Sequence, residues 1–478
     1  MEAQPLKNCD QSDTSFQIPG QVMGRHRHEG VILSSSVIYL AYALPLLLLF
    51  YFASRKRRVL ETNSSETWSE ALASGMTQPP SLHPVIDPTR CIGCESCIHA
   101  CPEFPAHQVL GIIKHKAVLV SPTDCIGHGA CKAVCPVEAI SLVFGTAERG
   151  VDIPEVNSDF STNVPGIFIA GELGGMGLIR NAINQGREAI NSVALYVKKS
   201  AQVRSHEDSD KTVDVCIIGA GPAGIAATLG AQQAGLSYVT LEQDKLGGTV
   251  ANFPRGKLVM TAPAELPGVG TMYFKETSKE QLVEFWNDIA ARSAMKVNYG
   301  ERLVSVDASP EQPLSIVSDR ASYRAQTLLL AIGRRGTPRK LGVPGEELSK
   351  VAYAFTDPEQ YRDRTVLVVG GGDSAIEAAC SIIEETGACV SLSYRSAAFT
   401  RAKAKNRQRL EKLSSTGQLK LLLETQVTAI APESVTLQGK EGSIEIANNA
   451  VLVCAGGILP DGMLREMGIQ VEAKYGKV

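Results

Sequence analysis

The feature that most constrains this chain is a cysteine spacing that occurs twice between residues 91 and 136. The first run has the form C-x2-C-x2-C-x3-C-P and contains Cys91, Cys94, Cys97 and Cys101. The second run repeats the spacing and contains Cys125, Cys131 and Cys135, with His128 in place of its second cysteine. In such paired runs, three closely spaced thiolates bind one iron–sulfur cluster, and the fourth cysteine of each run reaches the other cluster.

The spacing therefore predicts two groups of cluster ligands. Set A contains Cys91, Cys94, Cys97 and Cys135. Set B contains Cys101, Cys125 and Cys131, with His128 as a candidate fourth ligand. A ligating imidazole would replace a thiolate and raise the reduction potential of that cluster. Without it, set B would hold a three-iron cluster or a cube with one open iron. A zinc site, the main alternative, usually uses two C-x2-C pairs and does not need the doubled spacing.

Composition narrows the functional classes. The chain has 478 residues, enough for two to four domains. Its net charge of −3 argues against binding to nucleic acid. Seven of its twelve cysteines belong to the two runs. Since cluster ligands must be free thiolates, we expect a reducing compartment.

An uncharged stretch of 23 residues, 31–53, precedes these motifs and is followed by Arg55-Lys56-Arg57-Arg58. A helix of this length would cross a bilayer, and the basic cluster would lie on the cytoplasmic side. A cleaved signal peptide would have a shorter apolar core nearer the start of the chain. We therefore predict a single-pass transmembrane helix over 31–53 in the cell membrane, with the bulk of the chain in the cytoplasm. Residues 1–30 are predicted to be disordered, and 54–84 to be a linker with one short helix near 66–73.

Two short apolar runs, 109–113 and 117–120, separate the cysteine motifs and predict a β-hairpin. With this hairpin, residues 85–145 resemble the bacterial dicluster ferredoxins. The resemblance implies a small α+β domain that holds two 4Fe-4S clusters. His128 is where the chain departs from the pattern of that family.

A glycine-rich turn follows the apolar strand pattern of residues 213–218. Its glycines are Gly219, Gly221 and Gly224, and an Ala-rich helix pattern comes next. Glu242 ends the following strand pattern, where a carboxylate suits a ribose hydroxyl. Because strand, turn, helix and acid occur in order, we predict a dinucleotide site for FAD, which Gly248 and Thr249 would also approach.

A second glycine-rich turn follows the strand pattern of residues 366–369. Its candidate ligands are Gly370, Gly372, Asp373, Ser374 and Ala375. The next strand pattern ends at Arg395, where an NAD-specific unit would carry an acid. An arginine at this position favours the 2′-phosphate of NADPH over NADH.

Residues 162–172 end in Ala-Gly-Glu and precede a helix pattern over 178–198. This segment resembles the closing FAD motif of the thioredoxin-reductase-like flavoproteins. The resemblance implies contacts of Gly171, Glu172 and Ala182 with FAD, although that family usually carries Asp in place of Glu172. Since that motif normally lies near the C-terminus, we infer a circular permutation in which residues 201–211 join the former ends.

The expected fold is α/β, with two Rossmann-like dinucleotide-binding domains, a small dicluster ferredoxin domain and one transmembrane helix. After the ferredoxin domain, the predicted order is a permuted part of the FAD domain (146–200), a linker (201–211), the FAD domain (212–345), the NAD(P)H domain (346–457) and a return to the FAD domain (458–478).

Residues 354–364 lack the C-x2-C dithiol that thioredoxin reductases carry there, so the chain is more similar to ferredoxin–NADP reductases of the same type. The main hypothesis is a membrane-anchored oxidoreductase that transfers electrons between NAD(P)H, FAD, two iron–sulfur clusters and an unknown acceptor. The alternatives are a reductase of disulfides or small acceptors and a non-catalytic redox sensor or electron-carrier adaptor. Expected partners are a redox protein or membrane electron carrier, the lipid bilayer and a second copy of the chain, but no nucleic acid.

Overall fold

A computed structural model describes residues 35–476, except for residues 74–75, 80–81, 106, 149, 176, 202–211, 261–262, 275, 310–312 and 400–401. The predicted disorder of 1–30 and most of the predicted linker 201–211 lie outside the described residues. The chain divides into two compact units, Met1–Val59 and Leu60–Val478. Each unit is described by itself below.

Helix α1 (Ser35–Ala73) begins in the first unit. Its large apolar side chains between Tyr39 and Phe52 are exposed wherever they are described, as at Leu47, which is 64% exposed. Within the part of the chain that the structure describes, no helix is both long enough and apolar enough to cross a membrane. The transmembrane helix predicted over 31–53, whose first four residues are not described, is therefore unsupported by the structure.

Helix α1 continues without a break to Ala73, so residues 54–65 of the predicted linker are helical, and the short helix predicted near 66–73 is the last part of α1. Ser64 explains why this part of the helix is ordered. Its side chain is fully buried and accepts hydrogen bonds from the backbone N–H of Ile112 at 3.1 Å and from Gln108 at 2.8 Å. The C-terminal part of α1 around Ser64 therefore packs on the ferredoxin domain and is not a flexible linker.

We expect Ser64→Ala to lower the stability of the ferredoxin domain by about 1–2 kcal/mol, because the buried N–H of Ile112 loses its acceptor. A lower melting temperature, measured with iron content as a check on cluster loading, would show this effect. Thr67→Ala is the matched control, since its exposed hydroxyl bonds only to the helix's own backbone. Equal melting temperatures for the two variants would contradict the packing of α1 described here.

The ferredoxin domain has a compact core shared by its cysteines and two small antiparallel sheets. Strand β1 (His83–Ile86) pairs with β4 (Ile140–Val143), and β2 (Leu110–Ile113) pairs with β3 (Lys116–Leu119). The predicted hairpin is thereby confirmed. Helices α2 (Ser96–His99) and α3 (Ala130–Ala133) carry cysteines of the two runs, and η1 (Pro122–Asp124) precedes the second run. Cys91, Cys97 and Cys131 are part of the buried core.

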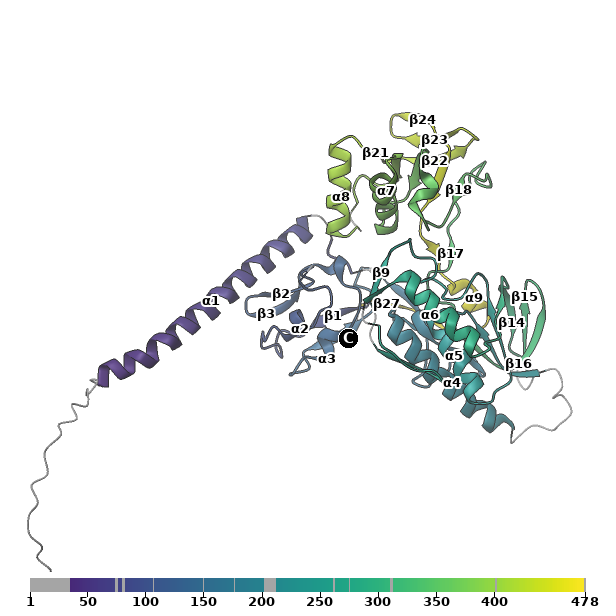
Figure 1. Ribbon diagram of the computed structural model, residues 1–478, viewed down its shortest axis with the longest axis horizontal. Helices are drawn as coiled ribbons and strands as arrows, with labels where there is room; N and C mark the ends of the chain where they lie inside the picture. The colour runs from purple at the N-terminus through teal and green to yellow at the C-terminus, as the bar shows by residue number, and fades with distance from the viewer. Residues whose placement is uncertain are drawn as a thin grey trace, which may run out of the picture. The chain divides into compact units, whose positions relative to one another are not determined.

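The first dinucleotide-binding fold contains a mixed sheet with helices α4 (Ile179–Ala201), α5 (Pro222–Gln233) and α6 (Lys279–Arg292) (Figure 1). Its strand order is β13-β8-β7-β16-β15-β14, and β6 also pairs with β16. The bounds are β6 (Ile167–Ile169), β7 (Thr212–Ile218), β8 (Tyr238–Glu242), β13 (Asn298–Tyr299), β14 (Leu303–Asp307), β15 (Leu314–Ser318) and β16 (Ser322–Leu330). Strand β6 precedes the first glycine turn in the sequence, and it pairs in parallel with the end of β16.

The end of the chain returns to this first fold. Strand β27 (Val471–Lys474) pairs antiparallel with β5 (Val151–Pro154), which directly follows the ferredoxin domain. Helix α9 (Asp461–Glu466) contributes Leu464 to the same buried core as β6, β7 and β16. Shorter pairs complete this part: β9 (Leu258–Met260) with β12 (Glu276–Ser278), β10 (Ala264–Leu266) with β11 (Gly270–Met272), and β17 (Thr337–Pro338) with β26 (Gly457–Ile458).

The second dinucleotide-binding fold has a parallel sheet in the order β18-β25-β19-β20-β21. Its strands are β18 (Val351–Ala352), β19 (Thr365–Val369), β20 (Cys389–Tyr394), β21 (Leu419–Leu423) and β25 (Ala450–Val453). Helices α7 (Asp373–Thr386) and α8 (Ala404–Ser415) pack beside each other, and η4 (Pro358–Tyr361) precedes β19. An antiparallel sheet of β22 (Gln426–Ile430), β23 (Ser434–Gly439) and β24 (Gly442–Ala447) is attached. The strand–turn–helix units predicted at both glycine motifs are confirmed.

Candidate functional site

A cavity of about 890 Å³ lies at the first glycine turn. Predicted FAD ligands from three separate segments line it: Gly171, Glu172, Ala182, Gly219, Gly221, Glu242, Gly248 and Thr249. The structure therefore brings together every predicted FAD residue except Gly224, which has a packing role. A Cβ at Gly224 would lie 1.8 Å from the carbonyl oxygen of Gly219, so only glycine allows the turn to close.

The glycine turn has room for a ligand on its open side. A Cβ at Gly221 would meet no protein atom within 4 Å, although Gly221 lines the cavity at the start of α5. A helix N-terminus with an open glycine is a suitable site for a pyrophosphate, because free N–H groups point toward it. These features fit the diphosphate of FAD.

Glu242 ends β8 at the wall of the same cavity and is 5% exposed. Its carboxylate accepts hydrogen bonds from the backbone N–H of Ala220 at 2.7 Å and of Asp244 at 2.9 Å. These bonds hold the carboxylate against the glycine turn. A carboxylate has about four acceptor positions, so lone pairs remain for a ribose hydroxyl.

The segment that resembles a displaced FAD motif packs directly on the glycine turn. A Cβ at Gly171 would lie 3.0 Å from the Cβ of Ala223, and a Cβ at Gly186 would lie 2.1 Å from the carbonyl oxygen of Ala223. Helices α4 and α5 therefore touch backbone to backbone. Sequence analysis missed Gly186, although an isolated glycine inside a helix pattern is a signal of close packing.

The carboxylate of Glu172 lies at the cavity, and the half-buried Arg334 lies within electrostatic range of it. Glu172 lines the cavity beside Gly177, whose Cβ would lie 3.3 Å from the carboxylate. Burial lowers the pKa of Arg334, whereas the carboxylates of Asp461, Glu172 and Asp152 oppose that change. Arg334 also donates a hydrogen bond to the carbonyl oxygen of Asp152. Sequence analysis did not identify Arg334, because no local motif marks it.

The second glycine turn has the same construction at the start of α7. A Cβ at Gly370 would lie 2.4 Å from the carbonyl oxygen of Cys454, whereas a Cβ at Gly372 would meet nothing within 4 Å. Ala375 is fully buried in the first turn of α7, and Ser374 is exposed. Arg395 is exposed directly after β20. The turn fits a second dinucleotide.

Asp373 has a structural role that the sequence did not indicate. Its Oδ1 accepts hydrogen bonds from the backbone N–H of Lys403 at 2.8 Å and from Asn406 at 2.7 Å. The carboxylate therefore ties the start of α8 to α7.

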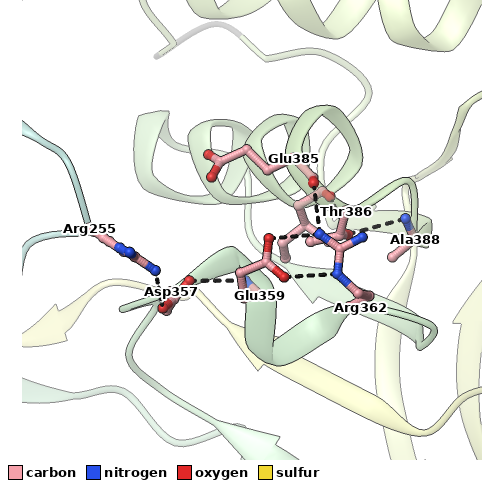
Figure 2. Close-up of polar contacts among 8 residues, drawn as sticks. Arg255, Asp357, Glu359, Arg362, Glu385, Thr386 and Ala388 are labelled. Atoms are coloured by element: carbon pink, nitrogen blue, oxygen red, sulfur yellow. Dashed lines mark hydrogen bonds and ion pairs between the residues drawn. The ribbon is translucent and has the colours of Figure 1, made fainter.

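Polar contacts connect the two dinucleotide-binding folds. The backbone N–H of Arg255 donates to the carbonyl oxygen of Thr356 at 2.8 Å, and its guanidinium lies 3.4 Å from Asp357. Figure 2 shows that Asp357 in turn accepts from the N–H of Glu359, which pairs with Arg362. The loop after the cavity residues Gly248 and Thr249 is thus bound to the second fold.

Set A gathers around one small cavity inside the ferredoxin domain. All of its predicted ligands line this cavity: Cys91, Cys94, Cys97 and Cys135. The backbone N–H of Ala117 donates to Sγ of Cys91 at 3.4 Å, and that of Ala139 donates to Sγ of Cys135 at 3.3 Å. Hydrogen bonds of this kind stabilise thiolate charge and help to set the potential of an iron–sulfur cluster.

The thiols of set B also lie close together. Burial raises the pKa of Cys125 to about 11, and the nearby Cys131 and Cys101 contribute to this rise. Burial likewise raises the pKa of Cys97 in set A to about 12, with Cys131 of set B as the largest charge contribution. Cys97 and Cys131 also belong to one buried core, so the two sets are neighbours.

His128 belongs to the second cysteine run and lies within electrostatic range of Arg180. Burial lowers its pKa, and the positive charge of Arg180 in the first turn of α4 lowers it further. Its Nδ1 is buried without a hydrogen-bond partner among the described residues. An orphaned ring nitrogen is compatible with an iron ligand, but ligation by His128 stays a prediction.

Among the residues that the structure describes, no group of three or more His, Cys, Asp or Glu side chains has the arrangement of a single-ion site. The described cysteines also form no disulfide. A four-iron cluster binds each thiolate through a different iron, so its ligands are more widely spaced than those around one ion. The doubled cysteine spacing, with Cys135 in the cavity of set A, is the pattern of iron–sulfur ligands and not of two C-x2-C zinc pairs.

Comparison with known proteins also separates a ferredoxin domain from the dinucleotide-binding folds. The family model described as pyridine nucleotide-disulphide oxidoreductase matches residues 216–477, and the 4Fe-4S dicluster domain matches residues 83–136. Bacilliredoxin reductase Bdr of Bacillus subtilis (strain 168) is 24% identical over 55% of this chain and 82% of its own length. A ferredoxin–NADP reductase of Lacticaseibacillus paracasei is 32% identical over 44% of this chain and 63% of its own length.

Among solved structures, the bacillithiol disulfide reductase Bdr of Staphylococcus aureus is 24% identical, with a TM-score of 0.47, over 56% of this chain and 85% of that chain. The oxidoreductase family model spans more than half of the 478 residues. The chain therefore belongs to the pyridine nucleotide-disulphide oxidoreductase family, in its thioredoxin-reductase-like form, and carries a 4Fe-4S dicluster ferredoxin domain.

Proposed function

We propose that this chain transfers electrons between NADPH and a redox partner protein through FAD and two iron–sulfur clusters. When bound, FAD accepts hydride and releases single electrons, and the clusters carry single electrons. The chain's own residues orient these groups. Gly221 and Glu242 would hold FAD, Gly372 and Arg395 would hold NADPH, and sets A and B would hold the clusters.

One contact carries this proposal: the ferredoxin domain packs on the segment that lines the flavin cavity. Phe144 follows directly after β4 of the ferredoxin domain. A Cβ added at Gly175 would lie 2.4 Å from the ring of Phe144, so the ring packs against this glycine. Gly175 follows η2 (Gly171–Gly174), whose Gly171 and Glu172 line the cavity. A ferredoxin domain in this position supports exchange of electrons with the flavin side.

Reduction of disulfides is a second candidate, because one relative is named a bacilliredoxin reductase. The site favours it less. Within the described part of the chain, no cysteine lines the cavity, and residues 354–364 contain none. A disulfide reductase of this family would use a pair of cysteines near the flavin, whereas electron transfer to iron–sulfur clusters needs no such pair.

Anaerobic titration of the purified holoprotein with NADPH tests the proposal. We expect the flavin absorbance to bleach and the EPR signals of reduced clusters to appear in the same titration. Dithionite serves as the control that both clusters can be reduced. Bleached flavin with clusters that only dithionite reduces would rule out the proposed transfer, and turnover of bacilliredoxin or thioredoxin substrates would then support a disulfide reductase.

The preference for NADPH gives a further prediction. Arg395→Gln should raise KM for NADPH about tenfold and leave KM for NADH unchanged, because one charged contact to the 2′-phosphate is lost. Lys420→Gln, which removes an exposed cation from the adjacent strand β21, is the matched control. Steady-state kinetics with both nucleotides measures the effect. Equal changes for NADPH and NADH would contradict the role of Arg395.

The order of segments supports a circular permutation of the flavin domain. Strand β6 and helix α4 precede the glycine turn in sequence but complete the sheet and cavity that the turn begins. Residues 201–211 would join the former ends. A variant chain in which residues 162–200 follow Val478 would test this, and retention of flavin is the expected result. Loss of flavin despite a normal melting temperature would contradict it.

Attachment to the cell membrane, with the remainder in the cytoplasm, is a separate proposal. It is supported by the exposed apolar side chains from Tyr39 to Phe52, since apolar surface of this extent marks contact with lipid or protein. We expect the full chain to sediment with membranes and to resist an alkaline carbonate wash, and Leu47→Arg with Phe50→Arg to reduce this. Recovery of the unaltered chain in the soluble fraction would overturn the proposal.

The formation of a homodimer by two copies of the chain stays a prediction.

A further inference from the structure

The two cluster ligand sets differ in their surroundings, and this difference assigns them different roles. Set A lines a cavity formed only by residues between Ile86 and Ile140, so no described residue of the flavin fold contributes to it. Set B adjoins the flavin fold through His128, which lies within electrostatic range of Arg180. This difference bears on the path of electrons, an inference that rests on the function proposed above.

Set B is the set closer to the flavin cavity. Arg180 belongs to the first turn of α4, and its neighbours Ile179 and Ala182 line that cavity. The Phe144–Gly175 contact fixes the same side of the ferredoxin domain to the flavin segment. The Leu142 side chain that precedes Phe144 touches Gly129, one residue after His128. The Phe144–Gly175 contact, together with the Leu142–Gly129 contact inside the ferredoxin domain, places the His128 loop on the side of that domain that meets the flavin segment.

Set A has the more accessible position. Cys94 is exposed, whereas the described thiols of set B are buried or partly buried. The neighbouring Ile92 is 60% exposed and also borders the set A cavity. An exposed apolar side chain beside an exposed ligand is suited to brief contact with a partner protein.

The two sets are close enough to exchange electrons with each other. Cys131 of set B belongs to the same buried core as Cys91 and Cys97 of set A. Electron tunnelling falls steeply with distance, so adjacent centres give a faster route than a direct jump from the flavin to the far set.

We propose that electrons pass between the flavin side and set B, then between set B and set A, and that set A exchanges them with an external one-electron carrier protein near Ile92 and Cys94. One NADPH would give a hydride to FAD and become NADP⁺. The two electrons of that hydride would leave FAD one at a time, one for the cluster held by each ligand set, and its proton would be released to solvent. The carrier then takes each electron from set A.

Two matched variants test this order. Cys125→Ala removes one thiolate from set B, and Cys94→Ala removes one from set A. In the set B variant, we expect dithionite to reduce the set A cluster normally, while NADPH reduces it at least 100-fold more slowly. In the set A variant, NADPH should still reduce the set B cluster, but reduction of added cytochrome c should fall at least tenfold. Rapid-freeze EPR and iron content are the readouts.

Reduction of set A by NADPH at the wild-type rate in Cys125→Ala would overturn the proposed order. If a variant loses both clusters by iron content, the time course of the wild type decides the question. The signal of set B must then rise no later than that of set A after mixing with NADPH, and the reverse order overturns the proposal. Failure of the proposed function is distinguishable, because NADPH would then reduce neither cluster in the wild type.

Discussion

Gly221→Ala is expected to fold normally and to bind FAD at least tenfold more weakly than the wild type. Gly221 has φ −76°, a backbone conformation that alanine adopts without strain. Its added methyl group would meet no protein atom within 4 Å and would enter the cavity. A dinucleotide pyrophosphate needs the backbone at this glycine to approach closely, so the methyl group would exclude it.

The second glycine turn supplies a reciprocal control for this experiment. Gly372 also has an ordinary φ, and its Cβ would also meet nothing within 4 Å. Gly372→Ala should retain flavin and raise KM for NADPH at least tenfold, whereas Gly221→Ala should lose flavin. Flavin per polypeptide, melting temperature and NADPH kinetics measure the two effects. Loss of flavin in both variants, or in neither, would contradict the assignment of the two turns.

The parts of the site that sequence could predict are those encoded within a few residues. The turn at Gly219, Gly221 and Gly224 follows from a strand, three glycines and a helix that are adjacent in the chain. The close approach of Gly224 to the carbonyl oxygen of Gly219 shows why the third glycine is required. The crossed grouping of Cys135 with set A also follows from local spacing, and the structure places Cys135 in that cavity.

Features that depend on distant segments were missed or misjudged. The first part of the linker predicted over 54–84 is a helix that ends at Ala73, and Ser64 within it bonds to Ile112 and Gln108, which lie 48 and 44 residues away in sequence. No local pattern around Ser64 reveals those partners. Arg334 was missed for the same reason, since the carboxylates around it come from three separate segments. Propensity predicted a break in the chain where tertiary contacts maintain a helix.

Gly186→Ala is expected to lower the stability of the flavin fold by about 2–3 kcal/mol and to cause loss of FAD. In an isolated helix, alanine is more favourable than glycine by about 1 kcal/mol. In α4 the new Cβ would lie 2.1 Å from the carbonyl oxygen of Ala223 and 3.0 Å from its Cα. Both atoms belong to backbone, which cannot rotate away as a side chain can, so α4 must shift off α5.

Loss of FAD should follow from that shift, because α4 and the preceding η2 supply Ala182, Gly171 and Glu172 to the cavity wall. Asn191→Ala, at an exposed position on α4, is the matched control and should keep wild-type flavin and melting temperature. Flavin content and thermal unfolding of both variants provide the measurement. Wild-type flavin content in Gly186→Ala would mean that α4 does not pack on the glycine turn. The segment 162–198 would then have to serve a different site, and the flavin fold would need its final strand from elsewhere.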